Sequence, residues 1–212
     1  VSVLTLEYRR WCEQQQTKDL KAIILYTSAY GKTATLAQAI AKGVSQAGVA
    51  IQLINCEFTN PDDITQAVKD CDGFMIGTPT LAGHPPTQIQ TALGLVLSNA
   101  NQTKVAGVFG SYGWSGEAVD LVESKLQDAG YPFGFETMRV KFSPTEDTLH
   151  QCETAGAEFA RVLNRARKVR APRQAIVDAQ SDRTSQAVGR VTGSLCVVTM
   201  KSGNNHYGFL TS

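Results

Sequence analysis

From residue 21 onward, short apolar runs alternate with longer amphipathic stretches along the chain. This alternation is typical of repeated strand-helix units, which place parallel strands in one sheet and helices on both of its faces. We therefore predict an α/β fold built on a doubly wound, five-stranded parallel sheet. The expected strands are residues 22–26, 51–55, 73–77, 104–109 and 135–140, and the expected helices are residues 32–47, 62–69, 86–98, 115–129 and 146–167.

The composition excludes several classes of partner. The chain has 212 residues, of which 42% are hydrophobic, and this is enough to bury a full core. Its formal net charge of +1 gives no general attraction to nucleic acid or to anionic membranes. No apolar stretch approaches the ~20 residues of a membrane span, and residues 1–10 lack the pattern of a secretion signal. We expect a cytoplasmic protein with no nucleic acid partner and no membrane span.

The cysteines and histidines do not form a metal-binding pattern. The five cysteines are odd in number and include no Cys-x-x-Cys pair, which argues against a disulfide framework and a zinc site. The histidines lack the i,i+4 spacing of metal ligands. We therefore predict reduced thiols and no metal site. The residues concerned are Cys12, Cys56, Cys71, Cys152, Cys196, His84, His150 and His206.

Three loops follow expected strands and precede expected helices. In a doubly wound sheet, ligands bind beyond the carboxyl ends of the strands where the strand order reverses, so loops of this kind meet at one edge. Their combined chemistry predicts a single site for flavin mononucleotide (FMN). The loops are Thr27-Ser28-Ala29-Tyr30-Gly31-Lys32-Thr33, Pro79-Thr80-Leu81-Ala82-Gly83 and Ser111-Tyr112-Gly113-Trp114-Ser115-Gly116.

The first loop has the chemistry of a phosphate cradle. Hydroxyl residues surround Gly31 at the expected start of a helix, whose free N–H groups and dipole favour an anion. Lys32 would add a cation if it points inward. The loop lacks the leading glycine of a nucleoside triphosphate loop, because Tyr26 occupies that position, and this favours a monophosphate. The alternative is a tight turn in which Ser28 and Thr33 only cap the helix.

The second and third loops suit a planar ring. Thr80 and the small residues that follow it allow a ring to approach the backbone near the flavin N5 atom. Tyr112 and Trp114, spaced by glycines, can lie against a ring system. The alternatives are that Trp114 caps the core over the next helix, and that His84 is structural or exposed to solvent rather than directed at the ring edge.

The sequence shows no machinery for acid-base or nucleophilic catalysis. It has no Gly-x-Ser-x-Gly elbow, no Ser-His-Asp arrangement and no cysteine beside a histidine in a loop. We therefore expect a domain that moves electrons through its cofactor and does not itself make or break bonds.

These loops, with residues 109–118 (Phe-Gly-Ser-Tyr-Gly-Trp-Ser-Gly-Glu-Ala), resemble the flavodoxin-like domain of flavodiiron proteins. The resemblance implies a flavodoxin-like fold with strand order 2-1-3-4-5 over residues 20–168. In that family, the FMN domain passes electrons to a diiron centre in an adjacent metallo-β-lactamase-like domain, where oxygen or nitric oxide is reduced.

Both ends of the chain resemble parts of the cyanobacterial and plant subgroup of this family. Residues 1–19, with an expected helix at 6–15, resemble the connection out of the diiron domain. Residues 187–212, with an expected β-hairpin, resemble the start of a flavin reductase domain. Residues 169–186 are polar and without helical periodicity, and we expect them to form a linker. These features predict an internal fragment with a truncated reductase part and no diiron ligands of its own.

The resemblance implies an FMN-binding electron-transfer domain of a flavodiiron oxygen reductase, in a head-to-tail homo- or hetero-oligomer of flavodiiron subunits. It implies NAD(P)H or ferredoxin as the electron donor. The basic run over residues 161–173 either docks an acidic donor or is a solvated helix end. Two other classes stay open: a stand-alone flavodoxin-like carrier or NAD(P)H:quinone reductase, and a ligand-free structural module. A carrier is disfavoured because carrier flavodoxins are typically strongly acidic.

Overall fold

The computed structural model describes residues 20–189, 196–202 and 205–211. These residues fall into two units, which divide between Ala166 and Arg167. The first unit contains the parallel sheet and its helices. The helix expected at residues 6–15 lies outside the described residues.

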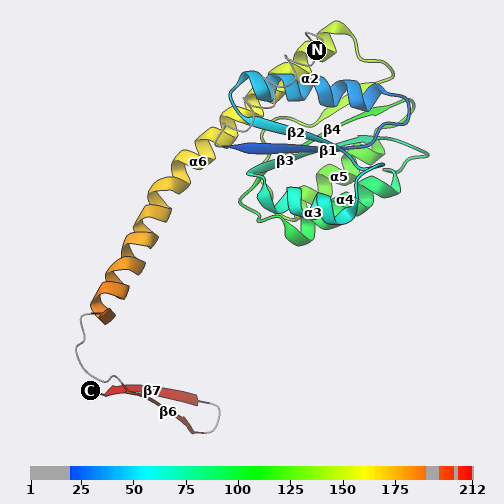
Figure 1. Ribbon diagram of the computed structural model, residues 1–212. Coiled ribbons are helices and arrows are strands. Elements are labelled where there is room, and N and C mark those ends of the chain that lie inside the picture. Colours follow the sequence, from blue (N-terminus) through cyan, green and yellow to red (C-terminus); the bar gives the residue numbers. More distant parts are fainter. Residues whose placement is uncertain (1–19, 190–195, 203–204, 212) are drawn as a thin grey trace, which may run out of the picture. The chain divides into compact units, whose positions relative to one another are not determined.

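The first unit is built on a five-stranded parallel sheet in the order β2-β1-β3-β4-β5 (Figure 1). This confirms the predicted fold and strand order. The strand order reverses between β1 and β3, which is where ligands bind in folds of this kind. The strands are β1 (Lys21–Tyr26), β2 (Ala50–Asn55), β3 (Gly73–Pro79), β4 (Val105–Tyr112) and β5 (Met138–Lys141).

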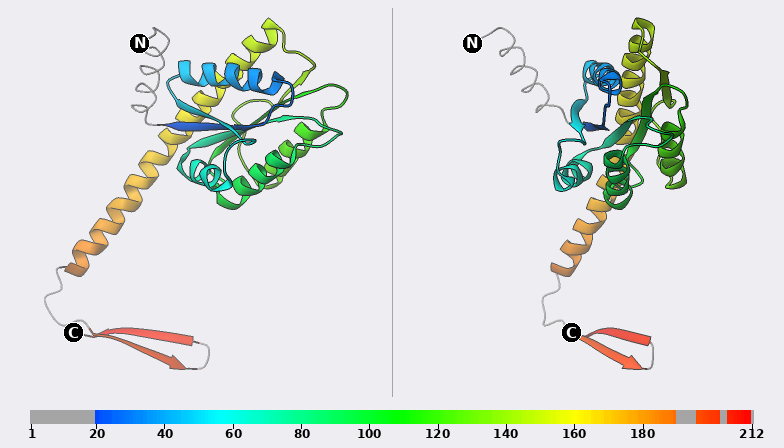
Figure 2. Two further views of the ribbon diagram at one scale, coloured as in Figure 1. Left: turned by 45° about the vertical axis from the view of Figure 1, so that its right-hand side comes forward. Right: turned by 90° about the vertical axis from the view of Figure 1, so that its right-hand side faces the viewer.

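Helices cover both faces of the sheet, so that the strands are buried on two sides (Figures 1 and 2). One apolar cluster joins the sheet to α2 and the first part of α6, and the other joins it to α3, α4 and α5. The helices are α2 (Lys32–Gln46), α3 (Pro61–Asp70), α4 (Thr87–Asn99), α5 (Glu117–Asp128) and α6 (Glu146–Gly189).

Successive residues of β1 supply the two clusters in turn. Ile24 belongs to the cluster under α2, whereas Ile23 and Leu25 belong to the cluster under α3 to α5. This follows from the two-residue period of a strand, and burial of each such side chain contributes about 1.5–3 kcal/mol. Because both faces of this strand are covered, its sequence is a continuous apolar run, and this run is what predicted the strand.

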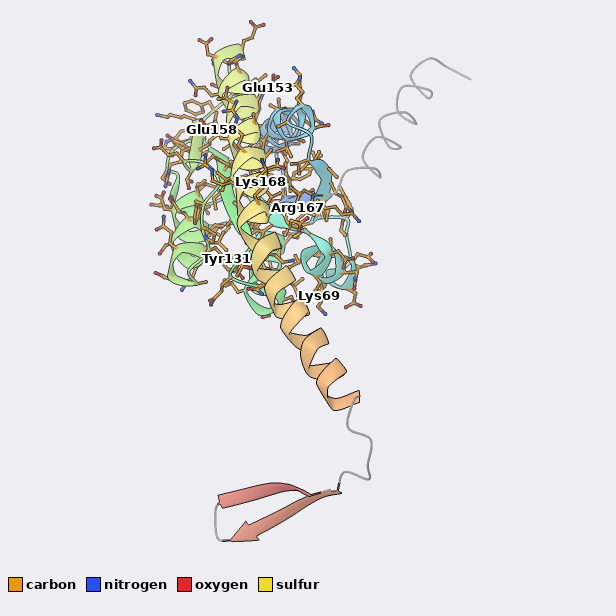
Figure 3. All side chains as sticks on the ribbon, turned by 90° about the vertical axis from the view of Figure 1, so that its left-hand side faces the viewer. Lys69, Tyr131, Glu153, Glu158, Arg167 and Lys168 are labelled. Carbon is orange, nitrogen blue, oxygen red and sulfur yellow. The ribbon has the colours of Figure 1, made fainter. Side chains whose placement is uncertain are left out.

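Two glycines allow α2 and α6 to approach closely. A Cβ atom at Gly43 would collide with the carbonyl group of Glu153, and one at Gly156 would collide with that of Ile40. Lys42 of α2 also forms an ion pair of 2.7 Å with Glu153. Figure 3 shows Glu153 on the α2 side of α6. This packing fixes α2, and therefore the loop that leads into it.

Two predicted boundaries are wrong. The helix predicted to end at residue 167 continues as α6 to Gly189, so residues 169–186, which we expect to form a linker, are helical. The Ala, Arg and Gln residues of this stretch favour helix, and Pro172 did not end it. The strand predicted at 135–140 begins only at Met138, because Phe133 pairs with Ala106 as an isolated bridge and the chain leaves the sheet in between.

The second unit includes an antiparallel hairpin of β6 (Cys196–Ser202) and β7 (Asn205–Thr211). This confirms a hairpin near the carboxyl end, with Ser202 paired to Asn205 across the turn. The expected start of its first strand at residues 190–195 lies outside the described residues.

A buried lysine closes the carboxyl end of α3. The Lys104 ammonium group donates to the carbonyl oxygens of Val68, Lys69 and Cys71 at 2.7, 2.9 and 2.6 Å. These carbonyls have few partners within the helix, and a cation also complements the helix dipole there. Lys104 is therefore a structural residue, although it precedes a strand whose far end reaches the loop cluster.

We expect Lys104→Met to lower the free energy of unfolding by about 1.5–3 kcal/mol, because the change leaves buried carbonyl groups without a donor. Urea denaturation followed by circular dichroism measures this loss. Lys69→Met removes an exposed positive charge from the same helix end, and we expect it to cost less than about 0.5 kcal/mol. Equal losses in the two variants would show that charge, and not the buried hydrogen bonds, stabilises this end.

Among the cysteines whose side chains the structure describes, three are buried free thiols: Cys56, Cys71 and Cys152. Burial raises the pKa of each of these thiols to about 11. The thiolate is the reactive form, so a raised pKa slows reaction at neutral pH.

In a Cys12→Ser, Cys196→Ser variant, we expect negligible reaction with a disulfide reagent at pH 8 in buffer. The three buried thiols should react fully in denaturant, where their pKa returns to the ordinary value. Rapid labelling of the folded protein at pH 8 would contradict the burial of these side chains.

Candidate functional site

The three predicted loops meet at the carboxyl edge of the sheet and line one cleft of about 430 Å³. The cleft lies beyond the ends of β3 and β4, beside the start of α2. It combines hydroxyl groups, one lysine and several aromatic rings. Its lining residues are Tyr30, Lys32, Pro79, Thr80, Leu81, Ser111, Tyr112, Gly113, Trp114, Phe142 and Ser143.

The first loop turns sharply into α2. Gly31 has φ 76°, a left-handed conformation that glycine adopts without strain, and the helix begins at the next residue. The Ser28 hydroxyl accepts a hydrogen bond of 3.1 Å from the Ala34 N–H in the first helical turn. Ser28 therefore satisfies one free N–H group at the start of α2, whose N-cap is Gly31, and Lys32 lines the cleft. The Thr33 hydroxyl bonds to Ser111 and does not cap the helix.

Thr27 has a buried side chain whose hydroxyl has no hydrogen-bond partner. Among the described residues, only one other buried side-chain oxygen is in this situation, the Thr80 hydroxyl in the second loop. A buried polar group without a partner costs about 1–3 kcal/mol. Thr80 lines the cleft, so its hydroxyl is placed to meet a polar ligand there, whereas Thr27 is fully buried outside the cleft lining.

Ser111 joins the three loops through short hydrogen bonds. Its hydroxyl shares a bond of 2.8 Å with the hydroxyl of Thr33 at the start of α2. Its carbonyl oxygen accepts a bond of 3.0 Å from the N–H of Thr80. The end of β4 therefore holds both neighbouring loops in place.

The second loop closes on itself. Leu81 and His84 exchange backbone hydrogen bonds of 3.0 Å, with Ala82 and Gly83 between them at φ 49° and 81°. Leu81 lines the cleft, but Ala82 and Gly83 do not. His84 is exposed and lies outside the cleft lining, in agreement with the alternative of a solvent-exposed residue.

The third loop presents its aromatic residue to solvent. Trp114 is 92% exposed, so the alternative of a core cap is wrong. Its ring packs edge-on against Phe142, with a centroid distance of 6.1 Å and an interplanar angle of 84°. Gly116 lies at the start of α5 and does not line the cleft.

The predicted site residues therefore divide into two groups. The first group lines the cleft directly. The second group, which supports the loops from outside the cleft lining, consists of Thr27, Ser28, Ala29, Gly31, Thr33, Ala82, Gly83 and Gly116. Sequence reasoning missed Phe142 and Ser143, which follow β5. The signal available was their position after the last parallel strand, whose carboxyl end reaches the same edge.

Comparison with known proteins identifies the family. The family model described as flavodoxin matches residues 24–156. This chain belongs to the flavodoxin family.

Several relatives of this chain are much longer than it is. A diflavin flavoprotein A of Nostoc sp. (strain PCC 7120) is 58% identical over 212 residues, which are 100% of this chain and 37% of the relative. The metal-soaked Flv1 flavodiiron core from Synechocystis sp. PCC6803 is 54% identical, with a TM-score of 0.75, over 77% of this chain and 40% of that chain. Rubredoxin oxygen:oxidoreductase from Desulfovibrio gigas is 25% identical, with a TM-score of 0.67, over 76% and 40%.

This flavodoxin-family chain thus spans little more than a third of the curated relatives that it matches first. It is similar to the flavodoxin-like part of flavodiiron proteins, which are oxidoreductases. The family and its diflavin relatives imply FMN as the cofactor.

The residues of the cleft fit FMN. The amino end of α2, with Lys32 beside it, suits a phosphate group because helix N–H groups and a cation both favour an anion. The aromatic and small residues of the other loops suit a planar ring. The unpartnered hydroxyl of Thr80, which lines the cleft, can be satisfied by a polar group of such a ligand.

Glu57, in the loop after β2, is a further residue that sequence reasoning missed. Its carboxylate accepts a hydrogen bond of 3.3 Å from the Ser28 N–H. This contact brings a negative charge to the loop that we expect to hold the phosphate. No motif signals it, because the two residues come from separate strand ends.

Other features of the described part of the chain do not compete with this site. A cavity of about 520 Å³ lies along β5 and the start of α6, shares Ser143 with the cleft, and has Glu136, Arg139 and Glu158 in its lining. Within the described ranges, no group of three or more His, Cys, Asp or Glu residues could hold a metal ion. None of the described helices has the length and apolarity of a membrane span.

We expect Glu57→Gln to raise the affinity for FMN about twofold to fivefold at low salt, because it removes a charge that repels the phosphate but keeps an oxygen acceptor for Ser28. Fluorescence titration at two salt concentrations measures the effect, which should shrink at high salt. Glu158→Gln, an exposed change on α6, is the charge-matched control. A weaker affinity in Glu57→Gln would mean that the carboxylate aligns the loop rather than opposes the ligand.

Proposed function

We propose that this chain is the FMN-binding electron-transfer domain of a flavodiiron oxygen reductase. In this proposal, electrons pass from the reduced flavin to a diiron site in a domain outside this chain, where oxygen is reduced to water. The observation that supports it best is the convergence of three separate loops on one cleft, whose lining includes Thr80 with its unpartnered buried hydroxyl.

The proposal assigns the phosphate to the first loop and the ring to the other two. Residues 28–33 would bind the phosphate through the amino end of α2, with Thr27 behind them. Residues 79–83 and 111–116 would hold the isoalloxazine between them. Ser111 would keep these walls at a fixed spacing, because it bonds to both neighbouring loops.

FMN, when bound, supplies one- and two-electron redox chemistry that no side chain of the cleft can supply. The cleft lining contains no His, Cys, Asp or Glu residue. Its own residues therefore bind and orient the cofactor, and we propose no proton transfer or covalent step for them. The half of the cleft formed by Trp114 is open to solvent, where a redox partner could approach.

We further propose that the chain works within a larger assembly in the cytoplasm. The relatives are longer and include a flavodiiron core, which supports a second domain with the iron site. In a head-to-tail homo- or hetero-oligomer, the FMN of one subunit would lie beside the iron of another. The donor of this proposal is NAD(P)H or ferredoxin.

Two alternative functions fit fewer observations. A stand-alone carrier or quinone reductase would share the cofactor, but the net charge of +1 and the longer relatives favour a domain of a larger protein. A ligand-free structural module would leave the Thr80 hydroxyl at the cleft without a partner, at a cost in free energy and without a gain.

Titration of the cofactor-free chain with FMN and with riboflavin tests the proposal. We expect FMN to bind with quenching of its fluorescence, and riboflavin to bind at least about tenfold more weakly because it lacks the phosphate that the helix end favours. Equal affinities would overturn the phosphate assignment, and no binding of either would overturn the function.

Variants of the cleft test the residue assignment in the same titration. We expect Thr80→Val to weaken FMN binding about tenfold while leaving the stability of the cofactor-free chain unchanged or higher, since it removes an unpartnered buried hydroxyl. Tyr30→Ala and Trp114→Ala should each weaken binding about threefold to tenfold. Phe58→Ala is the matched control, because Phe58 is exposed like Tyr30, at 85%, but does not line the cleft. Wild-type affinity in all three cleft variants would refute the assignment.

A further inference from the structure

Phe142 has an unusual backbone conformation beside the cleft. Only two non-glycine residues in the described ranges have positive φ, Ala82 at 49° and Phe142 at 58°, and both belong to loops around the cleft. For a bulky residue this conformation is strained, and such strain persists only where the surroundings hold it.

The strained residue is held by the end of β4. The N–H of Phe142 donates a short hydrogen bond of 2.7 Å to the carbonyl oxygen of Tyr112. Its neighbour Lys141 is paired with the same Tyr112 in the sheet register. The chain therefore turns away from the sheet at Phe142 while it stays tied to the first aromatic residue of the third loop.

The turn places the Phe142 ring over the third loop. The ring lines the cleft, lies edge-on to Trp114 and would be 3.8 Å from a Cβ atom at Gly113. Lys141 extends back over the same ring, with its Nζ atom 5.3 Å from the ring centroid. Trp114 is 92% exposed and Phe142 only 57%, so Phe142 is the better anchored of the pair.

We propose that Phe142 is a positioning residue that holds the Trp114 ring in place as a wall of the cleft, and so determines how tightly a planar ring is held there. The part that concerns the ligand rests on the proposed FMN function; the positioning of Trp114 does not. With an extended backbone at residue 142, the Phe142 ring would point in another direction. The contact between Phe142 and Trp114 therefore requires the strained conformation.

The positioning can be measured without cofactor. In a Trp11→Phe background, Trp114 is the only tryptophan, and its near-ultraviolet circular dichroism and fluorescence anisotropy report on the order of its ring. We expect Phe142→Ala and Phe142→Gly to reduce both signals strongly, and Phe142→Tyr to retain them. Phe142→Gly also relieves the backbone strain, so it separates loss of the ring from loss of stability. Unchanged signals in Phe142→Ala and Phe142→Gly would overturn the proposal.

The effect on the ligand is tested by a double-mutant cycle with FMN. We expect Phe142→Ala to weaken FMN binding about threefold to tenfold, with Phe142→Tyr close to wild type and Phe58→Ala as the exposed-phenylalanine control. In a Trp114→Ala background, Phe142→Ala should change the logarithm of the FMN affinity by less than about half as much as it does in the wild-type background. The reason is that Phe142 acts through Trp114.

Equal effects in both backgrounds would mean that Phe142 contacts the ligand independently, and would overturn its positioning role. If wild-type chain binds no FMN, the proposed function fails, but the cofactor-free measurements still decide whether Phe142 orders Trp114.

Discussion

The reversal of strand order between β1 and β3 is the constraint on which the site depends. Because β2 lies on one side of β1 and β3 on the other, the helices that follow β1 and β3 cover opposite faces, and the loops before them separate. The Thr27 N–H still donates to the Gly77 carbonyl at 3.3 Å, so the two strands stay paired up to this point. The opening between the loops is therefore a consequence of the topology. The close packing of α2 on α6 through Gly43 and Gly156 then fixes where the first loop ends.

The side chains around this opening are arranged for a ligand rather than for the stability of the chain alone. Ser111 satisfies its hydroxyl and carbonyl groups within the protein. The buried hydroxyls of Thr27 and Thr80 are not satisfied, and Trp114 exposes a large apolar ring. Each of these features costs free energy in the absence of a partner. At the opposite end of β4, by contrast, the buried ammonium group of Lys104 donates to three backbone carbonyl oxygens. The cost is concentrated at the carboxyl edge of the sheet.

The alternation of apolar runs and amphipathic stretches predicted the parallel sheet and the three loops, because covered parallel strands and surface helices have distinct periods. The strand order came from the resemblance to the flavodiiron family and not from this alternation. It did not predict how far α6 extends, since residues 169–186 lack an apolar stripe and no core contact marks the end of such a helix. Nor could it predict Phe142 or Glu57, whose roles depend on contacts with Trp114 and Ser28, residues far away in sequence. Trp114 itself was ambiguous from the sequence, because a tryptophan after a glycine suits both a core cap and an exposed wall.

The departures from simple sequence rules cluster where a ligand would bind. Natural sequences tend to violate local preferences at functional sites, since elsewhere such violations only destabilise the fold. Ala82 and Phe142 in positive φ, the unpartnered threonine hydroxyls and the exposed tryptophan all belong to the loops at one edge of one sheet. Strain in the backbone can be kept there because the paired ends of β3, β4 and β5 hold the loops from beneath. A rigid sheet that supports strained loops is the arrangement that allows a cofactor to be bound without reorganisation of the protein around it.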